Sequence, residues 1–177
     1  SVALIVHYTT IGLNAVIQRR GARVALLVTE GFRDVLEIGR SRMPFSFDFH
    51  ADKEAPLVPR DRVVELPARF AASGRPTREP DDEALAAAAA ALRALAPDAV
   101  ALMLINGYAN PAAEAMLADR LAGLLPGIPV SSAARLWPEI REYERTLVAC
   151  LNAGIQPLMQ RYFDLLSERL AAGGTTA

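Results

Sequence analysis

Two stretches of the sequence combine residue types that are able to bind an anion or to polarise a carbonyl group. In the first, VHYTTIGLNAVIQRRGA, Thr9, Thr10 and Asn14 stand where an apolar strand is expected to give way to a short helix. Threonine hydroxyls at such a place cap the helix by accepting hydrogen bonds from its free amides. Together with those amides they also suit an anion. The residues alone leave both interpretations open.

The second stretch is WPEIREYERT, which carries Arg141, Glu142 and Arg145. Charges at this spacing pair three and four residues apart on a helix, so an ordinary solvated face accounts for them. Trp137 and Tyr143 favour a site instead, because large aromatic side chains are costly to leave in water beside such charges. The sequence does not decide between these interpretations.

A third charged run, GFRDVLEIGR, ends at Arg40, and surface ion pairs again explain it without a site.

The sequence does not have the residue patterns that a metal centre, a phosphate-binding lysine loop or a serine nucleophile would need. His7 and His50 are the two histidines, so a histidine-rich metal centre is not expected. Lys53 is the one lysine and lies in no Gly-Lys-Ser/Thr loop, and no Gly-x-Ser-x-Gly elbow is present.

The composition narrows the class of protein. The chain has 177 residues, of which 52% are hydrophobic, enough for one good core. Its net charge of -1 argues against a nucleic-acid partner. Cys150 is the single cysteine, which excludes a disulfide scaffold and fits a cytoplasmic location. No apolar run reaches the roughly 18 residues of a membrane span, so no membrane partner is expected.

The hydrophobic pattern predicts strands that alternate with helices. Continuously apolar runs are typical of strands covered on both faces, and we expect strands at residues 2–6, 23–29, 99–105 and 128–133. Helical spacing and capping residues predict helices at 11–21, 32–39, 82–95, 110–125 and 138–172. Pro157 should kink or split the last of these near Gly154. This order is typical of an α/β domain with a largely parallel sheet.

The stretch 41–80 has a different texture, with six prolines and mixed charge. We expect it to be an irregular insertion or flap. Within it, RVVELPARFAASGRP has the pattern of a hairpin that turns at Ser73 and Gly74.

Three segments resemble one family. Residues 6–40 are similar to the N-terminal region of the hydantoinase A/5-oxoprolinase family, which also includes subunits of acetone and acetophenone carboxylases. INGYANPAAE, residues 105–114, is similar to the family's Tyr-x-Asn-Pro-x-x-Glu element. WPEIREYERT, residues 137–146, contains its Pro-Glu-Ile-Arg-Glu-Tyr-Glu-Arg signature. These matches follow the family's order and cover essentially the whole chain.

The resemblance implies an α/β fold of the actin, sugar-kinase and Hsp70 type (RNase H-like), with a largely parallel sheet and flanking helices. Residues 1–177 would form a single partial N-terminal domain, with the family's Gly-Gly-Thr-Phe-Thr-Asp phosphate loop and the downstream domain absent. The chain would then be a fragment of an ATP-dependent, magnesium-using hydrolase. Such an enzyme phosphorylates a lactam or imide ring, which water then opens, and it works with a hydantoinase B-type partner subunit or domain.

The resemblance also implies a site, in which two groups of side chains and one further arginine line a nucleotide and substrate cleft: Thr9, Thr10 and Asn14; Arg141, Glu142 and Arg145; and Arg40. Two residues depart from the family pattern. Tyr8 stands where glycine is common, and Leu13 replaces a frequent threonine. Two alternatives remain open, namely an ATP-dependent ketone carboxylase subunit and, for the isolated chain, a non-catalytic domain.

Overall fold

A four-stranded parallel sheet lies at the centre of the computed structural model, which describes residues 6–41, 50 and 54–174. The strands lie in the order β2-β1-β5-β6, with the bounds Val24–Thr29 for β1, Val63–Leu66 for β2, Ala99–Met103 for β5 and Val130–Ser132 for β6. The register places Val24 opposite Ala99 in the central pair. The predicted fold class, an α/β lobe with a largely parallel sheet and flanking helices, is confirmed.

The central strands are buried along their whole length, which explains their unbroken apolar sequences. Alternate side chains point to opposite faces of a strand, and β1 divides in this way between two cores. Ala25 and Leu27 face one core, and Leu26 and Val28 face the other. Each face of the sheet therefore needs its own cover of helices.

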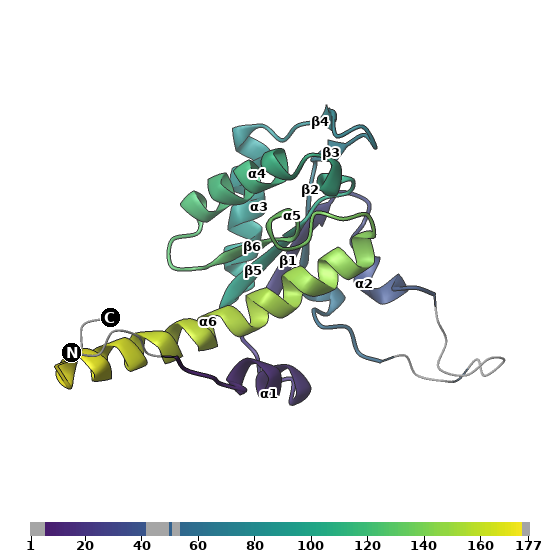
Figure 1. Cartoon of the computed structure of the whole chain (residues 1–177). Helices are drawn as coiled ribbons and strands as arrows, with labels where there is room; N and C mark the ends of the chain where they lie inside the picture. The colour runs from purple at the N-terminus through teal and green to yellow at the C-terminus, as the bar shows by residue number, and fades with distance from the viewer. Residues whose placement is uncertain (1–5, 42–49, 51–53, 175–177) are drawn as a thin grey trace.

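Helices cover both faces (Figure 1). The first core is closed by α3, Asp82–Ala94, and α4, Pro111–Leu124. The second is closed by α2, Val35–Ile38, α5, Ala133–Leu136, and α6, Glu142–Ala172. Two short 3₁₀ turns, η1 at Arg60–Arg62 and η2 at Gly107–Ala109, join these elements. Asp81 and Asn110 cap α3 and α4 by accepting hydrogen bonds from Ala84 and Ala113 amides, at 2.8 and 3.2 Å.

The long helix α6 runs through Pro157 as one element of 31 residues, so the predicted split does not occur. Proline removes one backbone donor from a helix, and here the helix continues on both sides of it although the buried residues of α6 end at Ala153. The Gly154 carbonyl also accepts a hydrogen bond from the Ala22 amide at 2.8 Å. The chain that enters β1 is thereby tied to the middle of α6.

The stretch 41–80 contains more regular structure than its prolines indicate. β2 belongs to the central sheet, and Leu66 at its end is fully buried. The two short strands β3, Arg69–Phe70, and β4, Pro76–Arg78, form an antiparallel hairpin. Its turn includes Gly74 at φ +79°, so the predicted turn at Ser73–Gly74 is confirmed. Residues 42–49 and 51–53 lie outside the described part.

The N-terminal segment lies beside the distal part of α6 (Figure 1). The short helix α1, Ile11–Ile17, packs on α6, where Gly12 faces Ile155 and Met159. Ahead of α1, the His7 ring stacks on Tyr162 and shares a hydrogen bond with its hydroxyl. The strand predicted at residues 2–6 falls outside the described residues except for Val6, which is in no strand.

Within the described part of the chain, no helix is both long and apolar enough to cross a membrane.

Cys150 lies on α6 inside the second core and is 3% exposed. Burial raises the pKa of its thiol to about 12, because the thiolate would lose its hydration. We expect no reaction with a thiol reagent at pH 8 until urea unfolds the protein.

The raised pKa of Cys150 also means that the thiol's contribution to stability is full below its ordinary pKa of 9.0 and is lost as the pH rises toward 12. Urea titrations at pH 8 and 10.5 should therefore show a smaller loss of stability in Cys150→Ala than in the wild type.

Candidate functional site

A cleft of about 660 Å³ lies at the carboxyl ends of the central strands. After β1 the chain continues to β2 on one side, and after β5 it continues to β6 on the other. In open α/β sheets, ligands bind beyond the carboxyl ends of two neighbouring strands whose following connections leave in opposite directions. We call this feature the carboxyl-edge cleft; it is lined by Gly31, Phe32, Asp34, Val35, Ile38, Gly39, Arg40, Arg69, Ile105, Asn106, Arg141, Glu142, Tyr143 and Glu144.

Side chains hold the turn after β5, which forms one wall of the cleft. The Ile105 amide donates to the Thr29 hydroxyl at 3.0 Å, which links the ends of the two central strands. Asn106 adopts the left-handed conformation, with φ +58°. Its side-chain amide donates to the Phe70 carbonyl at 2.9 Å, and its backbone amide donates to Glu142 at 3.4 Å. The turn is thus joined to the β3–β4 hairpin and to the start of α6.

A buried ion pair holds the same turn from behind. Glu114 and Arg145 are both fully buried, with 2.8 Å between Oε2 and Nη2. The Leu104 amide donates to Glu114 at 3.1 Å, and Arg145 donates to the Leu104 carbonyl at 3.1 Å. The other Glu114 oxygen accepts from the Ser132 hydroxyl at 3.0 Å and from the Ala134 amide at 2.8 Å. This pair therefore connects α4, α6, the end of β5 and the start of α5.

Two acidic groups in the cleft have arginine partners. Arg40 donates to Glu144 through Nε at 2.8 Å and Nη2 at 2.5 Å. Burial acts to raise the pKa of Glu144, but the Arg40 hydrogen bond and the positive charges of Arg40 and Arg141 outweigh it, and the pKa lies below its ordinary value. Asp34 pairs with Arg60, whose hydrogen bond lowers the pKa of that carboxyl. Both carboxyl groups are therefore ionised near neutral pH.

The remaining charged groups of the cleft have fewer bonds to other described residues. Among the described residues, Arg69 and Arg141 form no ion pair with a carboxylate, although Arg69 lies over the Phe32 ring, 5.6 Å from its centre. Arg141 has φ +108°, a conformation that is strained for a side-chain-bearing residue and that occurs most often at functional sites. Glu142 uses one oxygen for the weak bond to Asn106. These groups are available to a ligand.

The structure brings three of the predicted site residues together in this cleft, namely Arg40, Arg141 and Glu142. Arg145 lies behind the cleft, buried on Glu114.

Thr9, Thr10 and Asn14 lie elsewhere. Their helix packs on α6 near Ile155, which is 14 residues and about 21 Å along the helix from Arg141. The three side chains are exposed.

The Ile11 amide donates to the Thr9 hydroxyl at 3.2 Å, while Thr10 stands at the cap position without a side-chain bond to the backbone. Asn14 donates to the Thr10 hydroxyl at 3.3 Å. Capping therefore involves Thr9, and the Thr10 hydroxyl is bound to a side chain.

Three residues that hold or line the cleft were not among those expected from the sequence: Glu114, Asn106 and Arg69. A signal for Glu114 was present, because it shares a helix face with Leu117, Ala118 and Leu121 at the spacing of an apolar stripe, where a carboxylate needs a partner. Asn106 lies in the segment INGYANPAAE, but nothing in that segment pointed to its bonds with the β3–β4 hairpin and α6. Arg69 carried no signal, since its place in the cleft depends on the β3–β4 hairpin.

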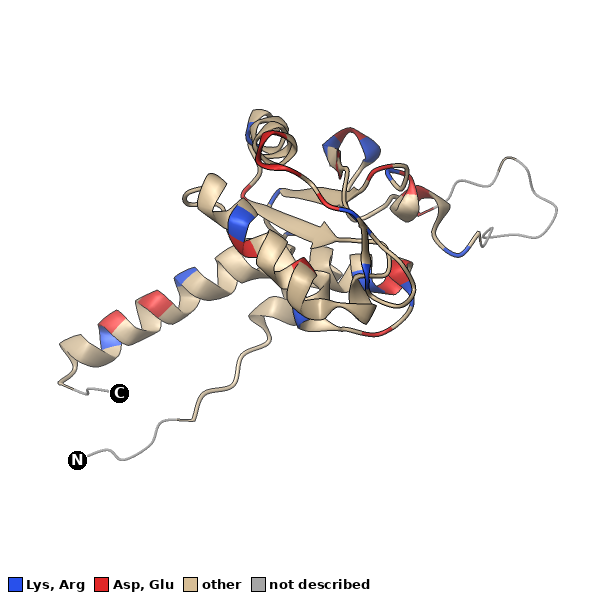
Figure 2. Ribbon diagram, turned by 90° about the horizontal axis from the view of Figure 1, so that it is seen from above, with Lys and Arg blue, Asp and Glu red and all other residues tan. Residues whose placement is uncertain are grey.

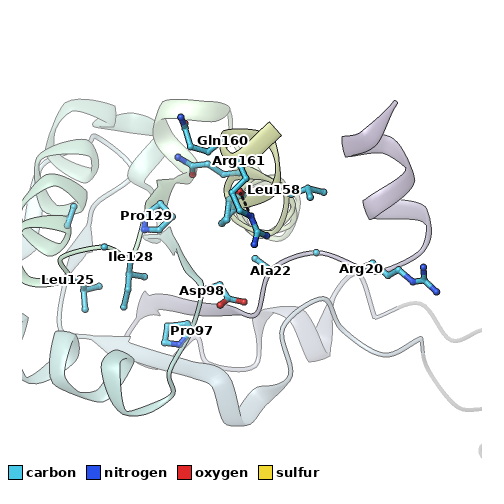
Figure 3. Close-up of a pocket in the computed structure, with 15 residues that line it drawn as sticks. Arg20, Ala22, Pro97, Asp98, Leu125, Ile128, Pro129, Leu158, Gln160 and Arg161 are labelled. Carbon is cyan, nitrogen blue, oxygen red and sulfur yellow. Dashed lines mark hydrogen bonds between the residues drawn. The ribbon is translucent and has the colours of Figure 1, made fainter. Parts of the chain in front are cut away.

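A larger cavity, of about 900 Å³, opens at the opposite end of the sheet (Figure 3). Its walls include Pro97, Ile128 and Pro129, which precede β5 and β6, and Arg161 of α6. Two of its charged groups bond within the protein: Asp98 accepts from the Arg23 amide at 2.7 Å, and Arg161 donates to the Pro157 carbonyl at 3.3 Å. Since it lies away from the carboxyl edge, we regard it as the weaker candidate despite its size.

The charges give no basis for a metal or nucleic-acid site in the described residues. No three of their His, Cys, Asp and Glu side chains lie close enough together to hold a metal ion. Basic and acidic residues are interspersed over the ribbon (Figure 2). Together with the net charge of -1, this distribution gives no run of basic residues along one described element that would favour a nucleic acid.

Comparisons with known proteins point to one family. The model of the hydantoinase/oxoprolinase N-terminal region matches residues 1–123. The alpha subunit of caprolactamase from Pseudomonas jessenii is 33% identical over 174 residues, which are 96% of this chain and 25% of that protein. The gamma subunit of acetophenone carboxylase from Aromatoleum aromaticum is 29% identical over 97% of this chain and 25% of its own length.

A solved structure has the same fold. The crystal structure of the ATP-dependent caprolactamase from Pseudomonas jessenii superposes with a TM-score of 0.82 at 30% identity, over 96% of this chain and 25% of that one. The chain thus spans about a quarter of the length of the relatives it matches.

Proposed function

Since the chain belongs to the hydantoinase/oxoprolinase family, we propose that it is part of an ATP-dependent hydrolase that opens a cyclic amide ring. One observation carries the proposal: the chain is 33% identical over 96% of its length to a subunit of an enzyme named for the hydrolysis of a lactam. The solved caprolactamase is described as ATP-dependent. The proposed reaction converts one cyclic amide, one ATP and two water molecules into the ring-opened acid, ADP and phosphate.

The energetic reason for using ATP is the stability of the amide. Transfer of a phosphoryl group to the amide oxygen makes the carbonyl carbon electrophilic, so that water can add to it and the ring nitrogen, once protonated, can leave. The acyl phosphate formed by this ring opening is then hydrolysed by a second water, which releases phosphate. The proposed protein groups are those of the carboxyl-edge cleft, in which Arg40, Arg141 and Glu142 meet. Arg145 positions the cleft from behind through Leu104.

The carboxyl-edge cleft does not offer a set of ligands for magnesium among the described residues. Its lining has three arginines and three carboxylates, and no three acidic or histidine side chains gather around one point among the described residues. Thr9, Thr10 and Asn14 are exposed and lie about 21 Å away along α6. They remain proposed cleft residues, and at that distance they would contact a part of the nucleotide or substrate other than the transferred phosphoryl group. We derive no step through the metal from this chain.

A partner subunit is part of the proposal, because both relatives are named as subunits. We propose a partner of the hydantoinase B type and a cytoplasmic location. A second function, ATP-dependent carboxylation of a ketone, is favoured by the 29% identity with the acetophenone carboxylase subunit over 97% of the chain.

The test is phosphate release from ATP by the intact gene product, together with its partner subunit if one is encoded beside it. Hydantoin, 5-oxoproline, caprolactam and a ketone with bicarbonate are supplied separately, and the organic product is identified by mass spectrometry. We expect phosphate release to depend on one of the cyclic amides and to match the ring-opened product in amount.

Each other outcome has a definite meaning. Release only with ketone and bicarbonate assigns the protein to the carboxylases. If a folded preparation releases no phosphate with any substrate, the protein shares the family's fold without its activity, and the chain is a non-catalytic domain.

A further inference from the structure

We propose that Arg69 binds the phosphoryl group that is transferred in the carboxyl-edge cleft, and that Asn106 positions Arg69 through the β3–β4 hairpin. The inference rests on the proposed function, which assigns phosphoryl transfer to this cleft but gives Arg69 no role. Arg69 lies outside the three segments that resemble the family, so only its place in the folded chain points to it.

Two of the three carboxylates that line the cleft are neutralised within the protein. Glu144 pairs with Arg40, which also lines the cleft. Asp34 pairs with Arg60, which comes from η1 and is not part of the lining. Neither pair leaves a net charge for a ligand to meet.

The charges that remain in the cleft favour an anion. Arg69 and Arg141 form no ion pair with a described carboxylate, and Glu142 is the lining carboxylate that lacks an arginine partner. These three groups together carry one net positive charge. A ligand with a negative group neutralises this excess, whereas a neutral ring leaves it in place.

Arg69 is held in the cleft by a contact that leaves its hydrogen-bond donors free. Its guanidinium carbon lies over the Phe32 ring, 5.6 Å from the ring centre. An aromatic face attracts the charge of an arginine, and the five N–H donors stay open to a ligand. None of these donors bonds to another residue in the described part of the chain.

The β3–β4 hairpin places Arg69 in the cleft. The register of the two strands shifts between Arg69 and Phe70, and irregularities of this kind re-aim a side chain and are frequent beside active sites. Phe70 is 3% exposed and packs in the first core, while Arg69 lines the cleft. One residue therefore anchors the strand, and its neighbour is presented to a ligand.

Two asparagine side chains fix the hairpin to the turn after β5. Asn106 donates to the Phe70 carbonyl, and Asn110 donates to the Gly74 carbonyl, both at 2.9 Å. The Asn106 bond is made to the residue directly after Arg69. Asn106 is therefore the asparagine that bears most directly on where the guanidinium lies.

A phosphoryl group matches this arrangement. In the proposed transfer, a lone pair of the amide oxygen forms the new bond to the γ-phosphorus, the ADP oxygen keeps the electron pair of the broken bond, and the ring nitrogen keeps its proton. Negative charge stays on the three peripheral oxygens throughout. Arg69 of β3 and Arg141 before α6 come from different elements, and cationic donors to such oxygens stabilise the transition state.

The experiment uses the intact protein with its partner subunit and compares Arg69→Gln with Arg75→Gln, an exposed arginine in the turn of the same hairpin that does not line the cleft. Calorimetry without ATP, at one ionic strength, measures the affinity for inorganic phosphate and for 5-oxoproline. Arg69→Gln should weaken phosphate by roughly 10- to 100-fold, the loss of one charged hydrogen bond. In turnover it should lower kcat and leave the KM for the cyclic amide within about twofold. Arg69→Lys should recover part of the loss, because it keeps the charge.

A double-mutant cycle tests the role of Asn106. Glycine adopts φ +58° readily, so Asn106→Gly removes the side-chain bond to Phe70 and keeps the turn. It should weaken phosphate several-fold on its own and have no further effect in Arg69→Gln, because it acts through that arginine. Equal losses in both backgrounds would mean that Asn106 does not position Arg69.

The outcomes separate this inference from the proposed function. A wild type that binds no phosphate overturns the inference, as does an Arg69→Gln variant that matches Arg75→Gln. A loss of affinity for 5-oxoproline as large as the loss for phosphate assigns Arg69 to a substrate carboxylate and also overturns it. If phosphate binds through Arg69 but no cyclic amide is opened with ATP, the inference stands and the proposed function fails.

Discussion

Replacement of Glu114 with leucine is expected to lower the free energy of unfolding by about 3–5 kcal/mol, the usual cost of removing one partner from a buried ion pair. Arg145 would be left charged at 0% exposure, with the Leu104 carbonyl as its remaining partner in the described structure. The Ser132 hydroxyl and the Leu104 and Ala134 amides would also lose their acceptor. Urea unfolding of the intact protein, followed by circular dichroism, measures the effect.

Two further variants make this test specific. Glu168→Leu changes an exposed glutamate on a helix and should shift stability by no more than about 0.5 kcal/mol. The double variant Glu114→Leu/Arg145→Met removes both charges together, and it should recover much of the loss because no unpaired charge remains buried. If Glu114→Leu alone costs less than 1 kcal/mol, the pair does not hold the fold together.

Substitution of Gly107 by alanine is expected to destabilise the protein by several kcal/mol, although only one methyl group is added. A Cβ at this position would lie 2.0 Å from Glu114 Oε2 and 3.0 Å from Arg145 Nη2. A carboxylate at the end of a free side chain would move aside. The Glu114 carboxylate cannot move aside, because four hydrogen bonds fix both of its oxygens. Any shift of the carboxylate breaks the hydrogen bonds that join Glu114 to Leu104, Ser132, Ala134 and Arg145.

Gly123 provides the matched control for this prediction. It lies on α4, and a Cβ built there meets no heavy atom within 4 Å, so Gly123→Ala should be neutral or stabilising. The double variant Gly107→Ala/Glu114→Gln tests the cause, because strain against Glu114 makes the two effects non-additive. Simple addition of the two losses, measured by urea unfolding, would mean that the Gly107 effect arises elsewhere.

Regular local patterns in the sequence predicted most of the elements, and long-range contacts account for those it missed. The runs that form β1, β5 and β6 are apolar throughout, and the caps of α3 and α4 are set by Asp81 and Asn110. The sequence assigned the residues of β2 to a hairpin and not to the central sheet, because they lie among prolines and their partner β1 is more than 30 residues earlier in the chain. Parallel pairing leaves no local sequence signal comparable to a hairpin turn.

Local sequence patterns also failed to predict the long-range contacts of the candidate site. Helical spacing placed Arg145 among charges three and four residues away, and surface pairs of that kind are common. Its actual partner, Glu114, is 31 residues away on another helix. Helical periodicity shows on which face of a helix a residue lies. It does not show which other element packs against that face. The family resemblance named Arg40, Arg141 and Glu142 without their roles, and only the folded chain places them in one cleft.

The pairing of β1 with β5 has a consequence for synthesis on the ribosome. Val24 is opposite Ala99, so 75 residues separate the two halves of the central pair. At about 5–20 residues per second, β1 waits roughly 4–15 seconds for its neighbour to be made. During that time the apolar run ALLV lacks its β5 neighbour, so one edge of β1 is exposed to aggregation. Fusion of a chaperone-binding segment ahead of it, or slower growth at low temperature, should therefore increase the yield of folded protein more than a stronger promoter does.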